Sequence, residues 1–489
     1  MRFNKSILLW AFAPLLSAQT WTYTLVADSN TVRPDGLGNF NVASTQPAIE
    51  GPWVVFVNDS DSIWSYNLSS RKFVKIVDTS MAVPGGSGNF NGFPVCDGDG
   101  ETVIQLHQGT VLFYGSDGKG PGFCSGGYYT VPVAGGTISK VLDYNTILPD
   151  GGVFSTPQNA PSLYQGKVVV SAQTQTPFDG GIWSVDTNGA DLARIADYNT
   201  PYCINPPGCT STAYEYVYGF IGGSNAAFTT YGELGWQGLF VTSVASPALT
   251  PILNNSDKLP GSPATTPQTF FQSPVVDGDN VYFVGSDEMA PSSACGGAFW
   301  GVFVTGLAGG SAGNVANTCD ALPGIPPIDS ANAFWPGMAA NEGTAVFYVG
   351  TTDGTYIYSS VNGALAPVVG YGDVLPDGTV DGVVAPGSGA INGGRVVFEV
   401  GVDGNEISSL YVASLGCATS ETKDVSITLG PLQHDQQTAT VTNTGKSALA
   451  GPLSLVVAGL PKGVTLANRN GTTVCVAPDG SIFVQRAID

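Results

Sequence analysis

Charged residues are scarce in this chain. They make up 11% of its 489 residues, with 17 Lys and Arg against 38 Asp and Glu. The net charge of -21 repels phosphate backbones and anionic lipid surfaces, which argues against nucleic acid as a partner and against peripheral membrane binding. Histidine is rarer still, with two in the sequence, His107 and His434, and no C-x-x-C pair occurs. We therefore expect no zinc site.

Long apolar runs and helical periodicity are missing after the first 18 residues. Residues 1–18 carry Arg2 and Lys5, then an apolar run from Ile7 to Leu16, then Ser17-Ala18, which is the plan of a secretory signal peptide. The run is too short to span a bilayer, and no later stretch could anchor the chain. We expect no membrane insertion and a protein that is secreted, either extracellular or periplasmic.

Catalytic motifs are also lacking. Gly309 to Gly313 matches G-x-S-x-G, but it lies in a Gly-rich hairpin rather than on a strand-to-helix elbow. A Ser-His-Asp triad would need His107, which we place in the second strand of its repeat, or His434, which lies outside the repeats. No P-loop or dinucleotide fingerprint is present. Carboxylate pairs for glycoside chemistry stay open, because Asp and Glu are many, but no spacing distinguishes one.

What the chain has in abundance is turn residues, 65 Gly and 33 Pro, and a repeated phrase. The phrase runs from Val26-Ala27-Asp28 into Pro34-Asp35-Gly36 in its first copy and occurs seven times in all. Its aligned positions are Asp28, Asp78, Asp143, Asp197, Asn254, Asp320 and Gly370. A spacing of 50 to 66 residues suits four short strands with their turns, which is one blade of a β-propeller.

The two ends of the repeat region indicate how the ring closes. The last repeat supplies Ala390-Ile391, Arg395 to Val400 and Leu410 to Ser414, but no fourth strand before Cys417. Thr22 to Ala27 forms a strand without a blade of its own. If it completes the last blade, both exposed sheet edges are paired. We therefore predict an all-β fold, a seven-bladed propeller over residues 19–416 that is closed by the N-terminal strand.

Export would allow the eight cysteines to form disulfides. Their order suggests pairing between neighbours, Cys96 with Cys124, Cys203 with Cys209, Cys295 with Cys319, and Cys417 with Cys475. The turn between Cys203 and Cys209 holds their ends together. Cys295 in an insertion and Cys319 at the end of a fourth strand would share one rim. Cys96 is predicted to end a first strand, away from the rim that carries Cys124, so this pairing stays open.

One face of the ring is the predicted binding site. The connections between blades, and those between the second and third strands, share a face, and the insertions Gly109 to Gly127 and Asp287 to Gly297 fall there. The candidate ligand-binding residues on this face are Asp117, Asp287, Glu288, Trp236, Trp300 and Trp335. The alternative for these Trp residues is packing between sheets, as we expect for Trp53, Trp64 and Trp183 in strands.

The acidic turns allow two interpretations. The Asp at the end of each fourth strand either caps the turn into the next blade or contributes to a ligand site. No cofactor is predicted, with Ca²⁺ as the alternative, because Asp-Gly and Asp-x-Asp turns such as Asp277-Gly278-Asp279 can also ligate calcium.

A family resemblance follows from these phrases. Asp28 to Phe40 and Asp78 to Phe90 resemble the blades of secreted bacterial β-propeller proteins of uncharacterised function, and Gly181 to Leu192 resembles a TolB-type blade. The resemblance covers residues 20–416 and implies the fold. It implies no catalytic residues, since such propellers include both binding scaffolds and enzymes.

The segment 417–489 changes to alternating strands, Val425 to Leu429, Thr438 to Asn443, Leu453 to Ala458 and Val464 to Ala467. Its Thr440 to Gly445 phrase resembles the Ig-like modules of secreted bacterial surface proteins. Its 73 residues fall short of the roughly 100 of a complete Ig sandwich, so we expect a minimal or incomplete Ig-like β-sandwich module.

Two classes of function remain. The first is a secreted or cell-surface scaffold, a non-catalytic monomer that binds an extracellular glycan, peptide or protein. The alternative is an extracellular propeller enzyme, a polysaccharide hydrolase or lyase. Clustered carboxylate, Arg or Tyr side chains at the mouth of the ring would favour the enzyme, and a mouth lined by Gly, Ser and backbone would favour the scaffold.

Overall fold

A computed structural model describes most of the repeat region and two short strands near the C-terminus. The described residues are 20–42, 46–93, 104–119, 126–149, 151–157, 161–174, 180–197, 200, 215–231, 237–246, 248–290, 298–324, 334, 337–361, 363–404, 407–416, 473–476 and 482–485. They contain strands and turns but no helix, and hence none that is long and apolar enough to cross a membrane.

The chain divides into two compact units. The smaller comprises Met1–Trp21 and Leu415–Arg486, and the larger comprises Thr22–Ser414 and Ala487–Asp489. In the smaller unit, β32 (Thr473–Val476) and β33 (Ile482–Gln485) form an antiparallel hairpin. The four strands predicted between Val425 and Ala467 lie outside the described residues.

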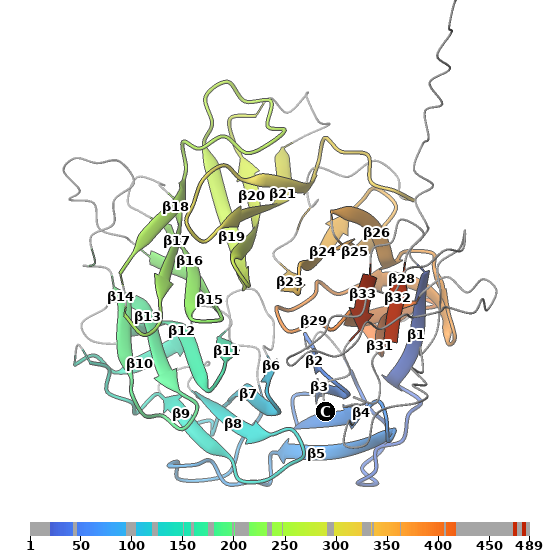
Figure 1. Ribbon diagram of the computed structural model, residues 1–489. Helices are drawn as coiled ribbons and strands as arrows, with labels where there is room; N and C mark the ends of the chain where they lie inside the picture. The colour runs from blue at the N-terminus through green and yellow to red at the C-terminus, as the bar shows by residue number, and fades with distance from the viewer. Residues whose placement is uncertain are drawn as a thin grey trace, which may run out of the picture. The chain divides into compact units, whose positions relative to one another are not determined.

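Within the described residues, the larger unit holds seven antiparallel sheets that follow one another around a ring, the blades of a propeller (Figure 1). The first three blades consist of β2 (Ala48–Glu50), β3 (Trp53–Asn58), β4 (Ser62–Asn67) and β5 (Lys72–Asp78); β6 (Ile104–His107), β7 (Thr110–Gly115), β8 (Gly127–Pro132) and β9 (Ser139–Asp143); and β10 (Phe154–Pro157), β11 (Ser162–Tyr164), β12 (Lys167–Thr174), β13 (Gly180–Asp186) and β14 (Ala193–Asp197). The next three consist of β15 (Glu215–Gly222), β16 (Asn225–Tyr231), β17 (Gln237–Ser243) and β18 (Thr250–Asn254); β19 (Thr269–Asp277), β20 (Asn280–Asp287), β21 (Phe299–Gly306) and β22 (Gly313–Asn317); and β23 (Met338–Asn341), β24 (Thr344–Gly350), β25 (Thr355–Val361) and β26 (Ala364–Gly370). The seventh consists of β27 (Val374–Leu375), β28 (Gly378–Val383), β29 (Ile391–Asn392), β30 (Arg395–Val402), β31 (Ile407–Gly416) and β1 (Thr20–Asp28).

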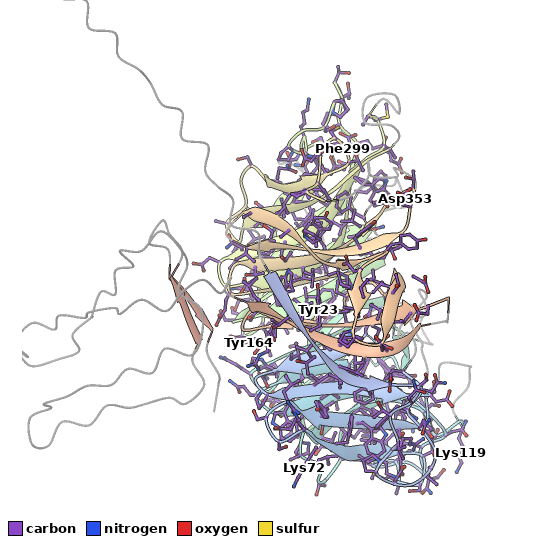
Figure 2. The ribbon with its side chains drawn as sticks, turned by 90° about the vertical axis from the view of Figure 1, so that its right-hand side faces the viewer. Tyr23, Lys72, Lys119, Tyr164, Phe299 and Asp353 are labelled. Atoms are coloured by element: carbon purple, nitrogen blue, oxygen red, sulfur yellow. The ribbon has the colours of Figure 1, made fainter. Side chains whose placement is uncertain are left out.

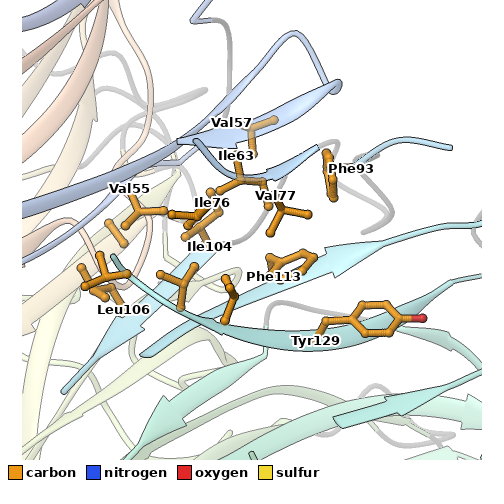
Figure 3. Close-up of a cluster of buried hydrophobic side chains, with 14 of the residues drawn as sticks. Val55, Val57, Ile63, Ile76, Val77, Phe93, Ile104, Leu106, Phe113 and Tyr129 are labelled. Atoms are coloured by element: carbon orange, nitrogen blue, oxygen red, sulfur yellow. The ribbon is translucent and has the colours of Figure 1, made fainter. Parts of the chain in front are cut away.

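The hydrophobic core lies between adjacent blades. Figure 3 shows one such cluster, to which the first blade contributes Val55, Ile63 and Val77 and the second contributes Ile104 and Phe113, all at most 1% exposed. Because each blade is covered on both faces, its middle strands are apolar on both sides, as in the buried run of β3. This explains why these strands read as continuous apolar stretches rather than as alternating ones.

The N-terminal strand closes the ring, as predicted. β1 pairs with β31 and is the outermost strand of the seventh blade, and the Thr22 hydroxyl donates to the Ser414 carbonyl at 3.3 Å. The Tyr23 hydroxyl donates to the carbonyl of Val368 in β26 at 2.7 Å, which ties β1 to the sixth blade as well. Burial, with a smaller contribution from the charge of Asp373, raises the pKa of Tyr23 to about 12, so this donor keeps its proton.

We call the first strand of each blade its inner strand and the fourth its outer strand. Side chains at the ends of inner strands link neighbouring blades. The Glu50 carboxylate accepts the N–H groups of Gln108 and Gly109, at 2.7 and 2.9 Å, from the turn of the next blade. Three other side chains act in the same way. Asp277 accepts N–H groups from the turn of the sixth blade, Asn341 accepts one from the turn of the seventh blade, and Asn392 accepts one from the turn of the first blade. These bonds satisfy turn N–H groups that the sheets leave unpaired.

The strand assignment of the second blade differs from the prediction. His107 ends the inner strand β6 instead of lying in the second strand, and the second strand β7 occupies the first part of the predicted insertion Gly109 to Gly127. The cause is the two-residue turn Gln108-Gly109, with φ of 50° and 71°, which is a tight hairpin turn without the Asn-Gly signal. Cys96, predicted to end the inner strand, lies outside the described residues.

The inner strand of the seventh blade also differs. Where the sequence predicted Ala390-Ile391, the structure has two segments. β28 pairs with the C-terminal half of β30, and β29 pairs with its N-terminal half. Pro386 lies between them and has no N–H for the sheet. A Cβ on Gly387 would lie 3.0 Å from the Cβ of Gln46 in the first blade, so this stretch packs closely against its neighbour.

The closing strand can be tested by two substitutions on it. Val26 is 4% exposed and Thr24 is exposed. We expect Val26→Asp to lower the free energy of unfolding by about 3 kcal/mol or more, because it buries an unpaired charge. Thr24→Asp adds the same charge to the exposed side of the strand and should change the free energy of unfolding by less than about 0.5 kcal/mol. Equal, small effects in urea unfolding would show that β1 is not part of the ring.

Candidate functional site

Two kinds of connection meet on one face of the ring. Connections from an outer strand to the next inner strand, and from the second strand to the third, leave at the same edge because neighbouring strands are antiparallel. In Figure 2, Lys119 and Asp353, both in second-to-third connections, lie toward the right, whereas Tyr164, which ends an inner strand, lies toward the left. We call the side with these two kinds of connection the loop face.

Each described outer strand that ends in Asp or Asn ends on the loop face in a capped turn. In the second blade, Asp143 Oδ1 accepts the Asn145 N–H at 3.1 Å and the Thr146 hydroxyl at 3.0 Å, and the Asp143 N–H donates to Thr146 Oγ1 at 2.8 Å. The corresponding caps are Asp28, Asp78, Asp197, Asn254 and Asn317. The capping interpretation of the repeated Asp is therefore confirmed.

The sixth repeat phrase is displaced by three residues from its predicted alignment. β22 ends at Asn317, whose Oδ1 accepts the Cys319 N–H at 2.8 Å. Asp320, predicted to be the cap, instead accepts the Asn317 N–H at 2.9 Å. The alignment failed because Asn caps this turn as well as Asp does. Cys319 thus follows the strand instead of ending it. It is disulfide-bonded.

The loop before the first blade holds an ion network. The guanidinium of Arg33, which is 6% exposed, donates to Asp35 at 3.0 Å and to Asp61 at 3.2 Å. Lys75 pairs with Asp35 at 3.2 Å. The cationic groups of Arg33 and Lys75 lie 5.7 and 5.9 Å from the centre of the buried Trp64 ring, close enough for cation–π attraction.

The network shifts the pKa of its members. Partial burial by itself raises the pKa of Asp35, but hydrogen bonds from Arg33, a backbone N–H and Lys75 outweigh it, so the pKa lies below its ordinary value. The pKa of Asp78 is lowered in the same way, against its burial, chiefly by Lys75 at 2.8 Å. The bond to Asp78 in turn raises the pKa of Lys75. These charges neutralise one another, so we assign the network to stability.

Asp287, one of the predicted ligand-binding residues, caps a connection. Its side chain is 1% exposed, Oδ2 accepts the Ser262 hydroxyl at 2.7 Å, and Oδ1 accepts the N–H groups of Gln268 and Met289 at 3.1 Å each. The carboxylate thereby ties two connections of the loop face together. Glu288 follows it and is exposed.

The predicted aromatic residues divide into two groups. Trp300 is the second residue of β21, and its partly buried side chain packs against the hydrophobic cluster between the fifth and sixth blades. Trp236 and Trp335 lie outside the described residues. Trp64 and Trp183, expected to fill the space between sheets, are 1% and 0% exposed.

Asp117, also predicted, forms a pair with a tyrosine that the sequence analysis missed. Asp117 Oδ1 accepts the Lys119 N–H at 3.0 Å, and Oδ2 accepts the hydroxyl of Tyr144 at 2.9 Å. Burial, and then the bond to Asp117, raises the pKa of Tyr144, so the phenol is protonated at neutral pH. The available signal was a Tyr directly after the capping Asp, where the first two repeats have Ser29 and Thr79.

Other ionisable groups surround this pair. Burial raises the pKa of Tyr129, and the charges of Asp143 and Asp117 and the neighbouring Tyr144 raise it further. Lys140 Nζ lies 3.3 Å from Asp143. Such a cluster of carboxylate and Tyr side chains was the feature expected of an enzyme. It lies over the second blade instead of at the mouth of the ring.

The inner strands toward the centre of the ring carry small and amide side chains. Gln105 Nε2 donates to Ser388 Oγ at 2.6 Å, which joins the second and seventh blades past the first. A Cβ on Gly389 would lie 3.0 Å from the Cβ of Ala48. Among the residues that the structure describes, no group of three His, Cys, Asp or Glu side chains is placed to hold a metal ion.

Neither a family model nor a curated protein matches this sequence. Solved structures with a similar fold include an oligogalacturonate lyase in complex with manganese, with 10% identity, a TM-score of 0.45, and 82% of this chain and 98% of that chain covered. A puromycin hydrolase shows 11% identity and a TM-score of 0.44, with 88% and 60% covered. The β-propeller domain of the Trilobed protease from Pyrococcus furiosus shows 10% identity and a TM-score of 0.43, with 76% and 95% covered. The likeness is one of fold, and no residue role is taken from it.

One expectation is corrected by these comparisons. The sequence analysis favoured a non-catalytic binding scaffold, but the similar structures are enzymes or a domain of one, including a polysaccharide lyase, Uly1, at 10% identity, a TM-score of 0.43, and 81% and 98% covered. The preference for a non-catalytic scaffold is therefore corrected and is not carried further.

The ion network should make stability depend on pH. Because the pKa of Asp35 is lowered by folding, its contribution to the free energy of unfolding is fully present above about pH 5 and is lost as the pH falls through the folded-state pKa. Asp35→Asn should therefore be less stable than the unmodified protein at pH 7, and the difference should shrink below pH 4. Asp279→Asn, at an exposed turn of the opposite face, should follow the unmodified protein throughout. A constant difference for Asp35→Asn would contradict the role of its charge.

Proposed function

We propose that this protein is an extracellular propeller enzyme that hydrolyses glycosidic bonds of a polysaccharide, with Tyr144 and Asp117 in its active site. The observation that supports this proposal is the 2.9 Å hydrogen bond from the Tyr144 hydroxyl to Asp117 Oδ2 on the loop face. A nucleophile within hydrogen-bonding reach of its base is the common requirement of covalent catalysis. Tyrosine serves as the nucleophile in some glycosidases.

The raised pKa of Tyr144 decides how the pair would act. A preformed phenolate is disfavoured, so the proton has to leave as the new bond forms. In the first step Tyr144 Oη bonds to the anomeric carbon, Asp117 takes the phenolic proton, and the glycosidic oxygen leaves with a proton from solvent. In the second step water attacks the same carbon and releases its proton to solvent, while Asp117 returns the proton to Tyr144.

The charge of the protein favours hydrolysis over elimination. A lyase acts on a uronic acid polymer, whose carboxylates would meet a chain of net charge -21 and a site that contains Asp117 and Asp143. A neutral or cationic polysaccharide meets no such repulsion. We therefore favour a hydrolase of neutral or cationic glycans over a lyase.

The remaining sequence expectations complete the proposal. Residues 1–18 act as a signal peptide for export, the blades are of the TolB type in a bacterial protein, and residues 417–489 form an Ig-like module. The enzyme acts as a monomer, without nucleic acid and without membrane insertion. It needs no cofactor, with Ca²⁺ as the alternative.

Two substitutions test the catalytic pair. Tyr144→Phe and Asp117→Asn should each lower kcat by about 10² to 10⁴, because they remove the nucleophile and its base. Tyr371→Phe is the matched control, since Tyr371 holds the same position after the last strand of the sixth blade and is 46% exposed. It should retain full activity.

The assay is release of reducing ends from a panel of neutral, cationic and uronic acid polysaccharides, with mass spectrometry of quenched reactions for a glycosyl adduct on Tyr144. Absorbance of an unsaturated product would indicate a lyase instead. Activity that survives in both Tyr144→Phe and Asp117→Asn would place the active site elsewhere. If the unmodified protein turned over none of these polysaccharides, the proposed enzymatic activity would be refuted.

The disulfides form a separate prediction. We expect the exported protein to contain Cys203–Cys209 and Cys295–Cys319, with Cys417–Cys475 as a third pair, whereas the pairing of Cys96 with Cys124 stays open. Peptide mapping without reductant should recover the first two cross-links. Free thiols at those positions, or a different partner for Cys319, would disprove the pairing.

A further inference from the structure

The exposed apolar side chains of the described residues gather on one face. Six large hydrophobic residues are between 46% and 79% exposed; five lie in connections of the loop face, and the sixth, Val374, begins β27 directly after such a connection. They are Val32, Leu37, Ile147, Met289, Tyr371 and Val374. Single exposed apolar residues are ordinary on a protein surface, but their restriction to one face of the ring is not.

Three of these residues occupy the same place in the repeat. Val32, Ile147 and Val374 are each the fourth residue after the end of an outer strand, and the residue that follows each is buried. The fold fixes the neighbours of this position, since the preceding residue bonds back to the strand and the next one packs inward, as Thr146 and Leu148 do. The fourth residue itself is free to be polar. An aliphatic side chain there is exposed to water without any gain for folding.

The three positions are also neighbours around the ring. Val374 begins the seventh blade, Val32 lies before the first and Ile147 before the third, with Ala82 at the same position before the second blade; Figure 1 shows the order of these blades around the ring. They therefore mark four consecutive junctions between blades. Leu37 is in the same connection as Val32. We call Val374, Val32, Leu37, Ala82 and Ile147 the apolar arc. The junction before the fifth blade has Lys258 at this position, and the junction before the sixth has an exposed alanine, Ala321.

Carboxylates accompany the apolar arc. Asp59, Asp373 and Asp403 are exposed in the same connections or in adjacent ones, and Asp61 keeps 44% of its side chain exposed. Of the cations nearby, Arg33 and Lys75 are paired within the ion network and Lys140 lies 3.3 Å from Asp143, whereas Lys119 is exposed and donates to Ser87 in the connection that holds Ala82, so carboxylates still outnumber cations here. A partner at this surface thus meets aliphatic groups set among negative charges.

This chemistry selects one kind of occupant. A second copy of the chain would bring its own charge of -21 against the same acidic surface, and an anionic membrane or acidic protein would be repelled as well. Sugars stack on aromatic rings, whereas the apolar arc is aliphatic. We propose that the apolar arc is a docking surface for a cationic polypeptide segment that interleaves Lys or Arg with apolar side chains. This function goes beyond the proposed hydrolysis and does not depend on it.

Three synthetic peptides test the proposal with the full-length protein. The first alternates Lys with Leu, the second has every Leu replaced by Ser, and the third has every Lys replaced by Glu. By fluorescence anisotropy the first should bind, more weakly as salt increases, and the other two should bind at least about tenfold more weakly, because each lacks one of the two complementary features.

The matched variants have three substitutions each. Val32→Ser/Ile147→Ser/Val374→Ser should weaken binding of the Lys-Leu peptide by about tenfold or more, because three aliphatic contacts are lost. Ala134→Ser/Ala190→Ser/Ala308→Ser makes the same change of polarity at exposed turns of the opposite face and should bind as the unmodified protein does. Circular dichroism melting should show both variants folded.

Three outcomes would overturn the proposal. Equal binding of the Lys-Leu and Lys-Ser peptides would mean that charge alone attracts them. Undiminished binding by the first variant would place the surface elsewhere. Sedimentation with phosphatidylcholine vesicles that requires Val32, Ile147 and Val374, without peptide binding, would assign the arc to a membrane.

Discussion

The pairing of β1 with β31 is the interaction on which the rest of the ring depends. A blade has two apolar faces and can bury both only if it has a neighbour on each side, as the cluster between the first two blades illustrates. Seven blades in a row would leave two faces and two sheet edges exposed. The closing strand removes both problems, and because the entropy of closing a loop grows only with the logarithm of its length, joining the two ends of the larger unit is a small penalty beside that burial.

Each junction between blades has to satisfy turn backbone groups on both faces, and the chain uses acidic or amide side chains for both. On the loop face an Asp or Asn such as Asp143 accepts N–H groups of its own turn. On the opposite face Glu50 or Asn392 accepts N–H groups from the next blade. Much of the acidity of the sequence is thus explained by folding. A cluster of Asp is therefore a weak guide to function in this protein, and the hydrogen bond of a particular carboxylate is a better one.

The parts of the fold that follow from local pattern could be predicted from the sequence. The number of blades, the closing strand and strands such as β30, expected at Arg395 to Val400, agree with the structure. The errors arose where unusual residues take a common role, as in the Gln108-Gly109 turn and the Asn317 cap. The candidate site could be found only in part. Asp117 was named from its connection, but its partner Tyr144 is 27 residues away in another connection, and no local pattern joins them.

Within a single turn of the loop face, some positions are fixed by folding and others are free to serve function. In the turn after β9, Asp143 caps the strand, Thr146 accepts its N–H and Leu148 packs inward, so these three positions are fixed by the fold. Tyr144 and Ile147 occupy the positions between them. Other repeats have Ser29, Thr79 or Tyr371 at the first of these positions and Val32, Ala82 or Lys258 at the second. The proposed catalytic residue and the proposed docking residue thus lie at positions that the fold leaves open. Seven similar turns can in this way carry dissimilar chemistry, because changes at these positions do not disturb the bonds that hold the blades together.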